Sequence, residues 1–246
     1  MRIESLSNGL GGQSMYCGWL AGQGRIPATV SISADTGSEE DCDWSTGEKT
    51  SARVYFEQVA KPLLNRWGLD AYFARAVDKN KVPLPPIHKW LEREIERAER
   101  GERQARFGSV SIPLFGSRKG RLAQSCTGKW KIAAINQQAR RLGATHLCSA
   151  QGIHYGEAAR RVKGIYIEDR NGLSIYQSTK RNRKTKEVTV IKWTSHYYPL
   201  VDLKLNREQV RGPIRKAGHS LSALNRVRHV STQGRGAMVA KLCCDD

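Results

Sequence analysis

The chain has 246 residues and a hydrophobic content of 39%, which is ordinary for a globular protein with one sizeable core. No apolar run approaches the roughly 18 residues of a membrane span and the N-terminus lacks a signal-peptide layout, so we expect a cytoplasmic protein with no membrane partner. The 41 Lys and Arg against 23 Asp and Glu give a formal charge of +18, which predicts a polyanionic partner, with nucleic acid favoured over a membrane surface or an acidic protein.

The first elements along the chain are a strand, a glycine-rich loop and a helix. The strand is predicted over 2–6, the loop over 7–14 and the helix over 15–22. A second strand is predicted over 28–34, and Asp35 follows it directly. An acidic residue therefore lies at the carboxyl end of that strand.

The central part of the chain alternates helices and strands. Hydrophobic periodicity predicts helices over 50–67, 87–103 and 128–142, and strands over 69–77 and 144–153. This alternation is typical of a parallel sheet with helices on its faces. We expect an α/β fold, Rossmann-like and three-layered, with a mostly parallel sheet.

Two β-like stretches, 164–176 and 187–198, flank a basic run and predict a hairpin excursion. The run has five positive charges in seven residues, namely Lys180, Arg181, Arg183, Lys184 and Lys186. These charges either contact the phosphates of DNA or a transfer RNA or are simply solvated. A helix over 206–217 completes a domain of residues 1–218, and 219–246 is predicted to be a basic C-terminal segment.

The glycine-rich loop is the first candidate site. A loop of this kind between a strand and a helix lets backbone N–H groups converge on phosphate oxygens, while the helix dipole adds positive charge. Three glycines fit that requirement, and two polar side chains add donors: Gly9, Gly11, Gly12, Gln13 and Ser14. No Gly-Lys-Ser/Thr ending is present, which argues against a Walker loop, and a plain turn is the alternative.

The neighbours of this loop favour a nucleotide site. The stretch from Ser7 through Glu39 resembles the S-L-G-x-G-x-Q-S … A-D-T-G-x-E signature of phage- and prophage-type phosphoadenosine-phosphosulfate (PAPS) reductase-like proteins of the PP-loop superfamily. Further blocks resemble the family in the same order: Ile112–Phe115, Gln124–Thr127 with Lys129 and Lys131, Gly152–Arg160, and Tyr198–Asp202 with Asn206-Arg207.

The resemblance implies an adenine-nucleotide site and roles for particular residues. Those expected to bind ATP are Ser7, Gly9, Gly11, Gly12, Gln13, Ser14, Asp35, Thr36 and Gly37. Asp35 and Glu39 are the expected ligands of Mg²⁺, although Asp35 could instead cap a turn. The resemblance also implies catalytic roles for Asp35 and for four residues expected on the side of the nucleotide site opposite the loop, namely Lys129, Lys131, Glu157 and Arg160.

The sequence departs from the family pattern at three places. Gly156 stands where the family usually has Asp, and the C-x-x-C-P element after the last helix is missing. The tail pair Cys243-Cys244 only faintly resembles the reductases' Glu-Cys-Gly-type ending. With six sparse cysteines and no C-x-x-C pair, we expect reduced thiols and neither structural zinc nor an iron–sulfur cluster.

Three functions are consistent with these features. The first is an ATP-dependent, adenylate-forming enzyme that releases AMP and pyrophosphate while transferring sulfur or nitrogen to a nucleic acid. The second is a sulfonucleotide reductase that uses a tail cysteine. The third is a nucleotide- and nucleic-acid-binding module that has lost catalysis. A partner protein or a second copy of the chain could complete any of these sites.

Overall fold

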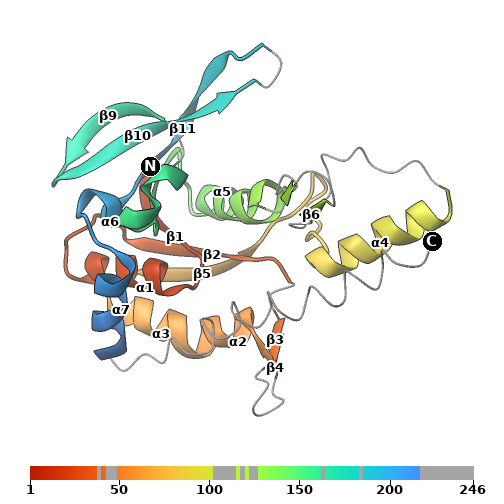
Figure 1. Ribbon diagram of the computed structural model, residues 1–246, viewed down its shortest axis with the longest axis horizontal. Coiled ribbons are helices and arrows are strands. Elements are labelled where there is room, and N and C mark those ends of the chain that lie inside the picture. The colour runs from red at the N-terminus through yellow and green to blue at the C-terminus, as the bar shows by residue number, and fades with distance from the viewer. Residues whose placement is uncertain are drawn as a thin grey trace.

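The computed structural model describes residues 1–37, 40–42, 49–101, 115–116, 120–121, 127–161, 164–182 and 185–216. These residues form a mixed α/β domain built on a seven-stranded sheet (Figure 1). The predicted C-terminal segment 219–246 lies outside the described residues, as do Glu39, Cys126, Arg183 and Lys184.

The main sheet has the strand order β5-β2-β1-β8-β11-β10-β9. Its strands are β1 (Arg2–Asn8), β2 (Val30–Asp35), β5 (Asp70–Arg75), β8 (His146–Gln151), β9 (Ile165–Arg170), β10 (Leu173–Arg181) and β11 (Val188–Tyr197). The first five strands in this order run parallel, whereas β10 is antiparallel to both β11 and β9. The expected mostly parallel sheet is confirmed.

Two short strand pairs lie outside the main sheet. β3 (Glu40–Cys42) pairs with β4 (Lys49–Ser51), and β6 (Phe115–Gly116) pairs with β7 (Gly120–Arg121). Both pairs are antiparallel.

The helices lie mainly in the connections between the parallel strands. They are α1 (Gly12–Gly22), α2 (Ala52–Tyr55), α3 (Lys61–Arg66), α4 (Ile87–Glu99), α5 (Ala133–Arg141), α6 (Pro199–Asp202) and α7 (Arg207–Lys216). Two π-helical segments, η1 (Phe56–Ala60) and η3 (Thr127–Ile132), lead into α3 and α5, and a 3₁₀ segment, η4 (Tyr155–Arg160), follows β8. None of the helices in the described ranges has the length and apolar character needed to cross a bilayer.

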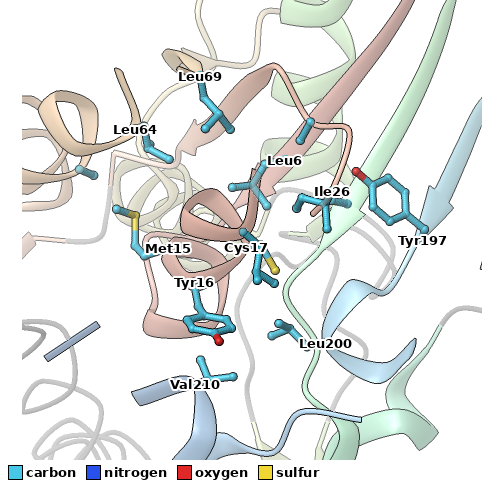
Figure 2. Close-up of a cluster of buried hydrophobic side chains, with 14 of the residues drawn as sticks. Leu6, Met15, Tyr16, Cys17, Ile26, Leu64, Leu69, Tyr197, Leu200 and Val210 are labelled. Atoms are coloured by element: carbon cyan, nitrogen blue, oxygen red, sulfur yellow. The ribbon is translucent and has the colours of Figure 1, made fainter. Parts of the chain in front are cut away.

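Buried side chains form two hydrophobic clusters, and β1 contributes to both. Successive side chains of a strand point to opposite faces, so Ile3 joins one cluster and Leu6 the other. Figure 2 shows the Leu6 cluster packed around α1, with Tyr16 and Cys17 from that helix. The second cluster includes Ala134 and Ala139 of α5. The two clusters therefore share β1, one including residues of α1 and the other residues of α5.

Close packing of α1 on α3 depends on two helical glycines. A Cβ on Gly18 would lie 2.7 Å from Leu64 Cδ2, and one on Gly22 would lie 2.7 Å from Trp67 Cβ. Such distances are shorter than real Cβ contacts, so larger residues at these positions would push the helices apart. This packing holds the second half of α1 against α3 and Trp67.

The β-like stretch 164–176 contains β9 and the first part of β10, which pair antiparallel. Asn171 and Gly172 form the turn between them with φ values of 54° and 76°. Asn and Gly both tolerate the left-handed region, and this dipeptide is a turn signal that the sequence interpretation overlooked.

Candidate functional site

The strand order creates a topological switch point between β1 and β8. From β1 the chain moves outward to β2 and β5, and it returns through α5 to β8 on the other side of β1. The connections that follow β1 and β8 therefore diverge at the carboxyl edge of the sheet. In open α/β sheets this crevice is where ligands bind. The predicted phosphate loop follows β1, and Glu157 follows β8, so the fold brings them to the same edge.

Asn8 fixes the loop that follows β1. Its Oδ1 accepts a hydrogen bond from the Leu10 amide at 2.8 Å, and its Nδ2 donates to Ser31 Oγ at 3.2 Å. Leu10 has a φ of 57°, which is unfavourable for a leucine, but its side chain is buried in the core. The Asn8 bond and the buried Leu10 side chain together hold the turn. Sequence reasoning missed Asn8, although Asn before Gly is a recognisable turn signal.

The loop presents donors at the start of α1. Gly11 is the N-cap residue, and no side chain caps the helix there. Ser14 Oγ accepts a hydrogen bond from the Gly9 amide at 3.3 Å, which leaves the hydroxyl proton for a ligand. The first amides of α1 and the partial positive charge of its N-terminus suit an anion. Gly9 and Gly11 lie in the short loop before α1, whereas Gly12, Gln13 and Ser14, which were predicted to belong to the loop, form the first turn of α1.

The segment after β8 packs directly on this loop. A Cβ on Gly152 would lie 2.9 Å from the Ser14 amide nitrogen and 3.1 Å from the Gln13 carbonyl carbon. Only a glycine allows the two backbones to come this close. In the strands that lead into these two segments, Ser7 Oγ of β1 and Ser149 Oγ of β8 share a hydrogen bond of 2.6 Å. These contacts join the two walls of the switch point.

Gln13, His154 and Glu157 form a polar cluster at the switch point. Glu157 Oε2 lies 3.4 Å from Gln13 Nε2 and 3.4 Å from His154 Nε2. The structure therefore brings together the predicted phosphate donor Gln13 and the predicted catalytic Glu157. His154 was assigned no role from the sequence, yet its ring touches the candidate acid. The side chain of Arg160 lies outside the described part.

Gly156 leaves room for the ring of His154. A Cβ at position 156 would lie 3.0 Å from His154 Cε1 and 3.2 Å from its Nδ1. An aspartate there, as the resembled family usually has, would require the imidazole to move. The departure at Gly156 and the position of His154 are therefore linked, which no pattern in the sequence indicates.

Asp35 is buried at the carboxyl end of β2 and has three partners. Its Oδ2 lies 3.0 Å from Arg53 Nη2 and 3.0 Å from Arg75 Nη2, and its Oδ1 accepts the Gly37 amide at 2.9 Å. The last contact is the turn-capping alternative considered for the sequence. Two arginines already neutralise this carboxylate, which disfavours a magnesium ion beside it, and the role of metal ligand remains a prediction. Thr36 is buried beside it, and Gly37 has a φ of 66°.

Lys129 and Lys131 lie in η3, at the start of the crossover from β5 to β8. Since the crossover runs antiparallel to the strands, its start lies at the carboxyl edge of the sheet. The Lys129 ammonium lies 4.9 Å from the ring centre of Trp90 and 4.8 Å from that of Trp130, within cation–π range. Trp130 is buried and donates its indole N–H to the Pro85 carbonyl at 3.0 Å. Lys129 is exposed and lies within cation–π range of both rings.

The basic run lies at the opposite end of the sheet. Gln177 of β10 is level with Ser195 of β11, which is in turn level with Cys148 in the middle of β8. Because β10 runs antiparallel to β8, its later residues, including Lys180 and Arg181, extend toward and past the amino edge. Figure 1 shows this end of β10 and β11 projecting from the rest of the domain. The basic run and the phosphate loop thus do not share a site.

The surroundings of Cys17 and Cys148 do not favour a reactive thiolate. Cys17 and Cys148 are buried, and burial raises the pKa of Cys17 to about 12 and that of Cys148 to about 11. Among the described residues, no group of three or more His, Cys, Asp and Glu could hold a metal ion. Cys243 and Cys244 fall outside the described ranges.

The chain gives no significant match to any protein-family model, curated protein or solved structure. What the site does must therefore be argued from its geometry.

Proposed function

We propose that this chain is a PP-loop protein with a three-layer Rossmann-like fold, similar to the phage-type PAPS reductase-like proteins, and that it uses ATP to form an adenylated intermediate. The observation that carries the proposal is the position of the Gly9–Ser14 loop. It joins β1 to α1 beside the switch point, with Gly152 packed on its backbone. The two hydrophobic clusters, one including residues of α1 and the other residues of α5, support the layered fold.

The loop would hold the part of ATP that leaves. The amides at the start of α1 and the Ser14 hydroxyl donate to the β- and γ-phosphates, and the helix N-terminus stabilises their charge. An acceptor oxygen forms a bond to the α-phosphorus as the bond to the bridging oxygen breaks, and pyrophosphate departs with the electron pair. A sulfur or nitrogen nucleophile then displaces AMP from the adenylated acceptor.

The opposite wall would supply orientation and charge. Glu157 accepts from Gln13 and so can hold the Gln13 amide toward the phosphates. Lys129 is positioned by Trp90 and Trp130 at the same edge and adds a cation for the developing negative charge. Lys131 and Arg160 belong to the same edge of the sheet, in η3 and η4.

Magnesium would come with the nucleotide. The described carboxylates near the loop are engaged, Asp35 by two arginines and Glu157 by Gln13 and His154. Mg²⁺ commonly binds through substrate phosphates with only one or two protein carboxylates. We therefore propose that the triphosphate supplies most ligands of the ion, and that Asp35 organises the turn at Thr36 and Gly37.

The acceptor we propose is a nucleic acid, in keeping with the formal charge of +18. The alternative of a sulfonucleotide reductase finds no support among the described cysteines, since Cys17 and Cys148 are buried and their pKa values are raised.

The test is incubation with α-labelled ATP, Mg²⁺ and pooled DNA and RNA, followed by separation of AMP from ADP. We expect AMP and pyrophosphate. Ser14→Ala removes one phosphate donor and should slow AMP formation by roughly 10²-fold, a typical loss for one charge-stabilising donor. Thr29→Ala is the matched control, because it removes an exposed hydroxyl at the start of β2, at the opposite edge of the sheet.

ADP as the product, thiol-dependent release of sulfite, or equal rates in the Ser14 and Thr29 variants would each contradict the proposal.

A further inference from the structure

The part of β10 and β11 beyond the sheet is the largest described feature that the nucleotide site does not use. Three register pairs join its strands: Thr179 with Val190, Lys180 with Thr189, and Arg181 with Val188. All described side chains from Thr185 to Val190 are exposed, and so are Lys180 and Asn182. We call this two-stranded projection, residues 179–182 and 185–190, the ribbon.

The ribbon is set off from the sheet by a large irregularity. Between the Gln177–Ser195 and Thr179–Val190 pairs, Ser178 alone lies opposite residues 191–194 of β11. The Gln177 side chain spans this bulge, because its Nε2 lies 2.6 Å from the Ile191 carbonyl and 2.7 Å from the Thr194 carbonyl. Bulges bend strands and increase their twist. The direction of the ribbon is therefore fixed by bonds within the chain.

The charge of the ribbon identifies the kind of partner. Lys180 and Lys186 are exposed on its two sides, Lys192 is exposed in the bulge, and Glu187 is the single acid among residues 179–192 of the sequence. Val188 and Val190 are exposed as well, at 54% and 40%. A narrow, basic, two-stranded ribbon with apolar side chains on one face has the dimensions and charge to enter the major groove of B-form DNA. The major groove of A-form RNA is too narrow for it.

We propose that the ribbon is a docking arm for double-stranded DNA, in which Lys180 and Lys186 contact backbone phosphates on either side of the groove. This inference rests on the proposed function only because both take a nucleic acid as the partner of the chain. It lies at the amino edge of the sheet and the phosphate loop lies at the carboxyl edge. The arm therefore anchors the duplex and takes no part in the chemistry at the loop.

The test measures DNA binding without ATP, by fluorescence anisotropy of a labelled duplex of 20 base pairs at several salt concentrations. Each phosphate contact contributes about 0.9 to the slope of log affinity against log salt, or about eightfold in affinity at 0.1 M salt. The double variant Lys180→Ala/Lys186→Ala should therefore lower the slope by about 1.8 and weaken binding roughly 60-fold at 0.1 M salt.

The matched control is Lys79→Ala/Lys81→Ala in the turn after β5. It removes the same charge from exposed positions, and Lys81 has a φ of 64°, close to the 61° of Lys186. The control should keep the slope and affinity of the unaltered chain. A Gln177→Leu variant, which loses both carbonyl contacts, should also weaken duplex binding because the direction of the ribbon is no longer fixed.

Three outcomes would contradict the proposed DNA-binding role of the ribbon. They are no binding of duplex DNA by the unaltered chain, equal losses of DNA affinity in the ribbon and control variants, and equal or tighter binding of duplex RNA or of single strands. Ser14→Ala should bind the duplex normally. If the chain does not turn over ATP but still binds DNA through the ribbon, the proposed chemistry is contradicted and the DNA-binding role of the ribbon is supported.

Discussion

Gly152 lies directly against the backbone of Ser14, so closely that a Cβ on Gly152 would be 2.9 Å from the Ser14 amide nitrogen. This contact joins the loop after β1 to the segment after β8. It also places Ser14 beside the segment that follows β8 at the switch point. The first prediction follows from this contact.

We predict that Gly152→Ala separates the two segments and weakens ATP binding. The added methyl group meets backbone, which cannot move aside as a flexible side chain can, so the free energy of unfolding should fall by roughly 1–3 kcal/mol. Chemical denaturation measures the stability, and calorimetric titration measures ATP binding. The control is Gly212→Ala in α7, whose Cβ would meet no atom within 4 Å beyond its chain neighbours. Because Pro213 follows and disfavours helical backbone for a residue with a Cβ, we expect no gain in stability, and ATP binding should not change. Equal effects of the two substitutions would contradict the packing argument.

We predict that Asn8→Ala loosens the phosphate loop. The change leaves the Leu10 amide and Ser31 hydroxyl without their buried partner, which should cost about 1–3 kcal/mol of stability. Leu10 should then leave its left-handed conformation, and affinity for ATP should fall because the donors no longer converge. Asn65→Ala, at an exposed position of α3, is the control and should change neither quantity appreciably. Unaltered ATP affinity in Asn8→Ala would show that the loop is not the phosphate site.

We predict that Asp35→Ala destabilises the chain through its arginine partners. Removing the carboxylate leaves Arg75 and Arg53 without their shared partner. Their side chains are 34% and 61% exposed, so water compensates part of the loss, and the cost should be about 1–2 kcal/mol. Adding Arg75→Met, which removes the less exposed of the two cations, should restore much of this loss. Thermal unfolding of the single and double variants checks both statements.

Asp35→Ala also separates the two roles considered for this residue. If Asp35 only organises the turn through the Gly37 amide, the affinity for ATP should stay lowered in the double variant, which still lacks that bond, while the dependence on Mg²⁺ is kept. A variant with normal stability but lost dependence on Mg²⁺ would instead support Asp35 as a metal ligand.

We predict a pH-dependent effect of Asp202→Asn. Burial raises the pKa of Asp202 above its ordinary value of 3.8, despite the hydrogen bond that its Oδ2 accepts from the Ser174 amide at 3.1 Å. The folded state therefore holds the proton more tightly than the unfolded state, so the ionised group lowers stability as pH rises above 3.8. Asparagine keeps an acceptor for Ser174 and carries no charge. The Tm difference between Asp202→Asn and the unaltered chain should thus grow from about pH 3 to pH 7.

The control for this titration is Asp70→Asn, because Asp70 is exposed on β5 and is not among the groups that act on Asp202. Its Tm difference should change little over the same range. A difference for Asp202→Asn that does not vary with pH would contradict a burial effect on the carboxyl group.

Local patterns in the sequence predicted much of the fold. Alternating apolar residues, glycines and helical spacing located β1, α1, β2 and the helix of 128–142, since these signals depend only on near neighbours along the chain. They also placed the glycine-rich loop between a strand and a helix. The same local reasoning failed at Asn171-Gly172, because an overall β-like pattern hid a two-residue turn.

Other relationships depended on contacts between distant segments. The sequence by itself determined the alternation of strands and helices, the glycine-rich loop at the start of α1 and the excess of positive charge, because each is a property of neighbouring residues or of composition. Only the tertiary structure decided that Gly152 touches Ser14, that Asp35 is neutralised by Arg53 and Arg75, and that the basic run lies at the edge opposite the loop. Strand order and register set these distances, and they come from packing the whole sheet rather than from any single segment.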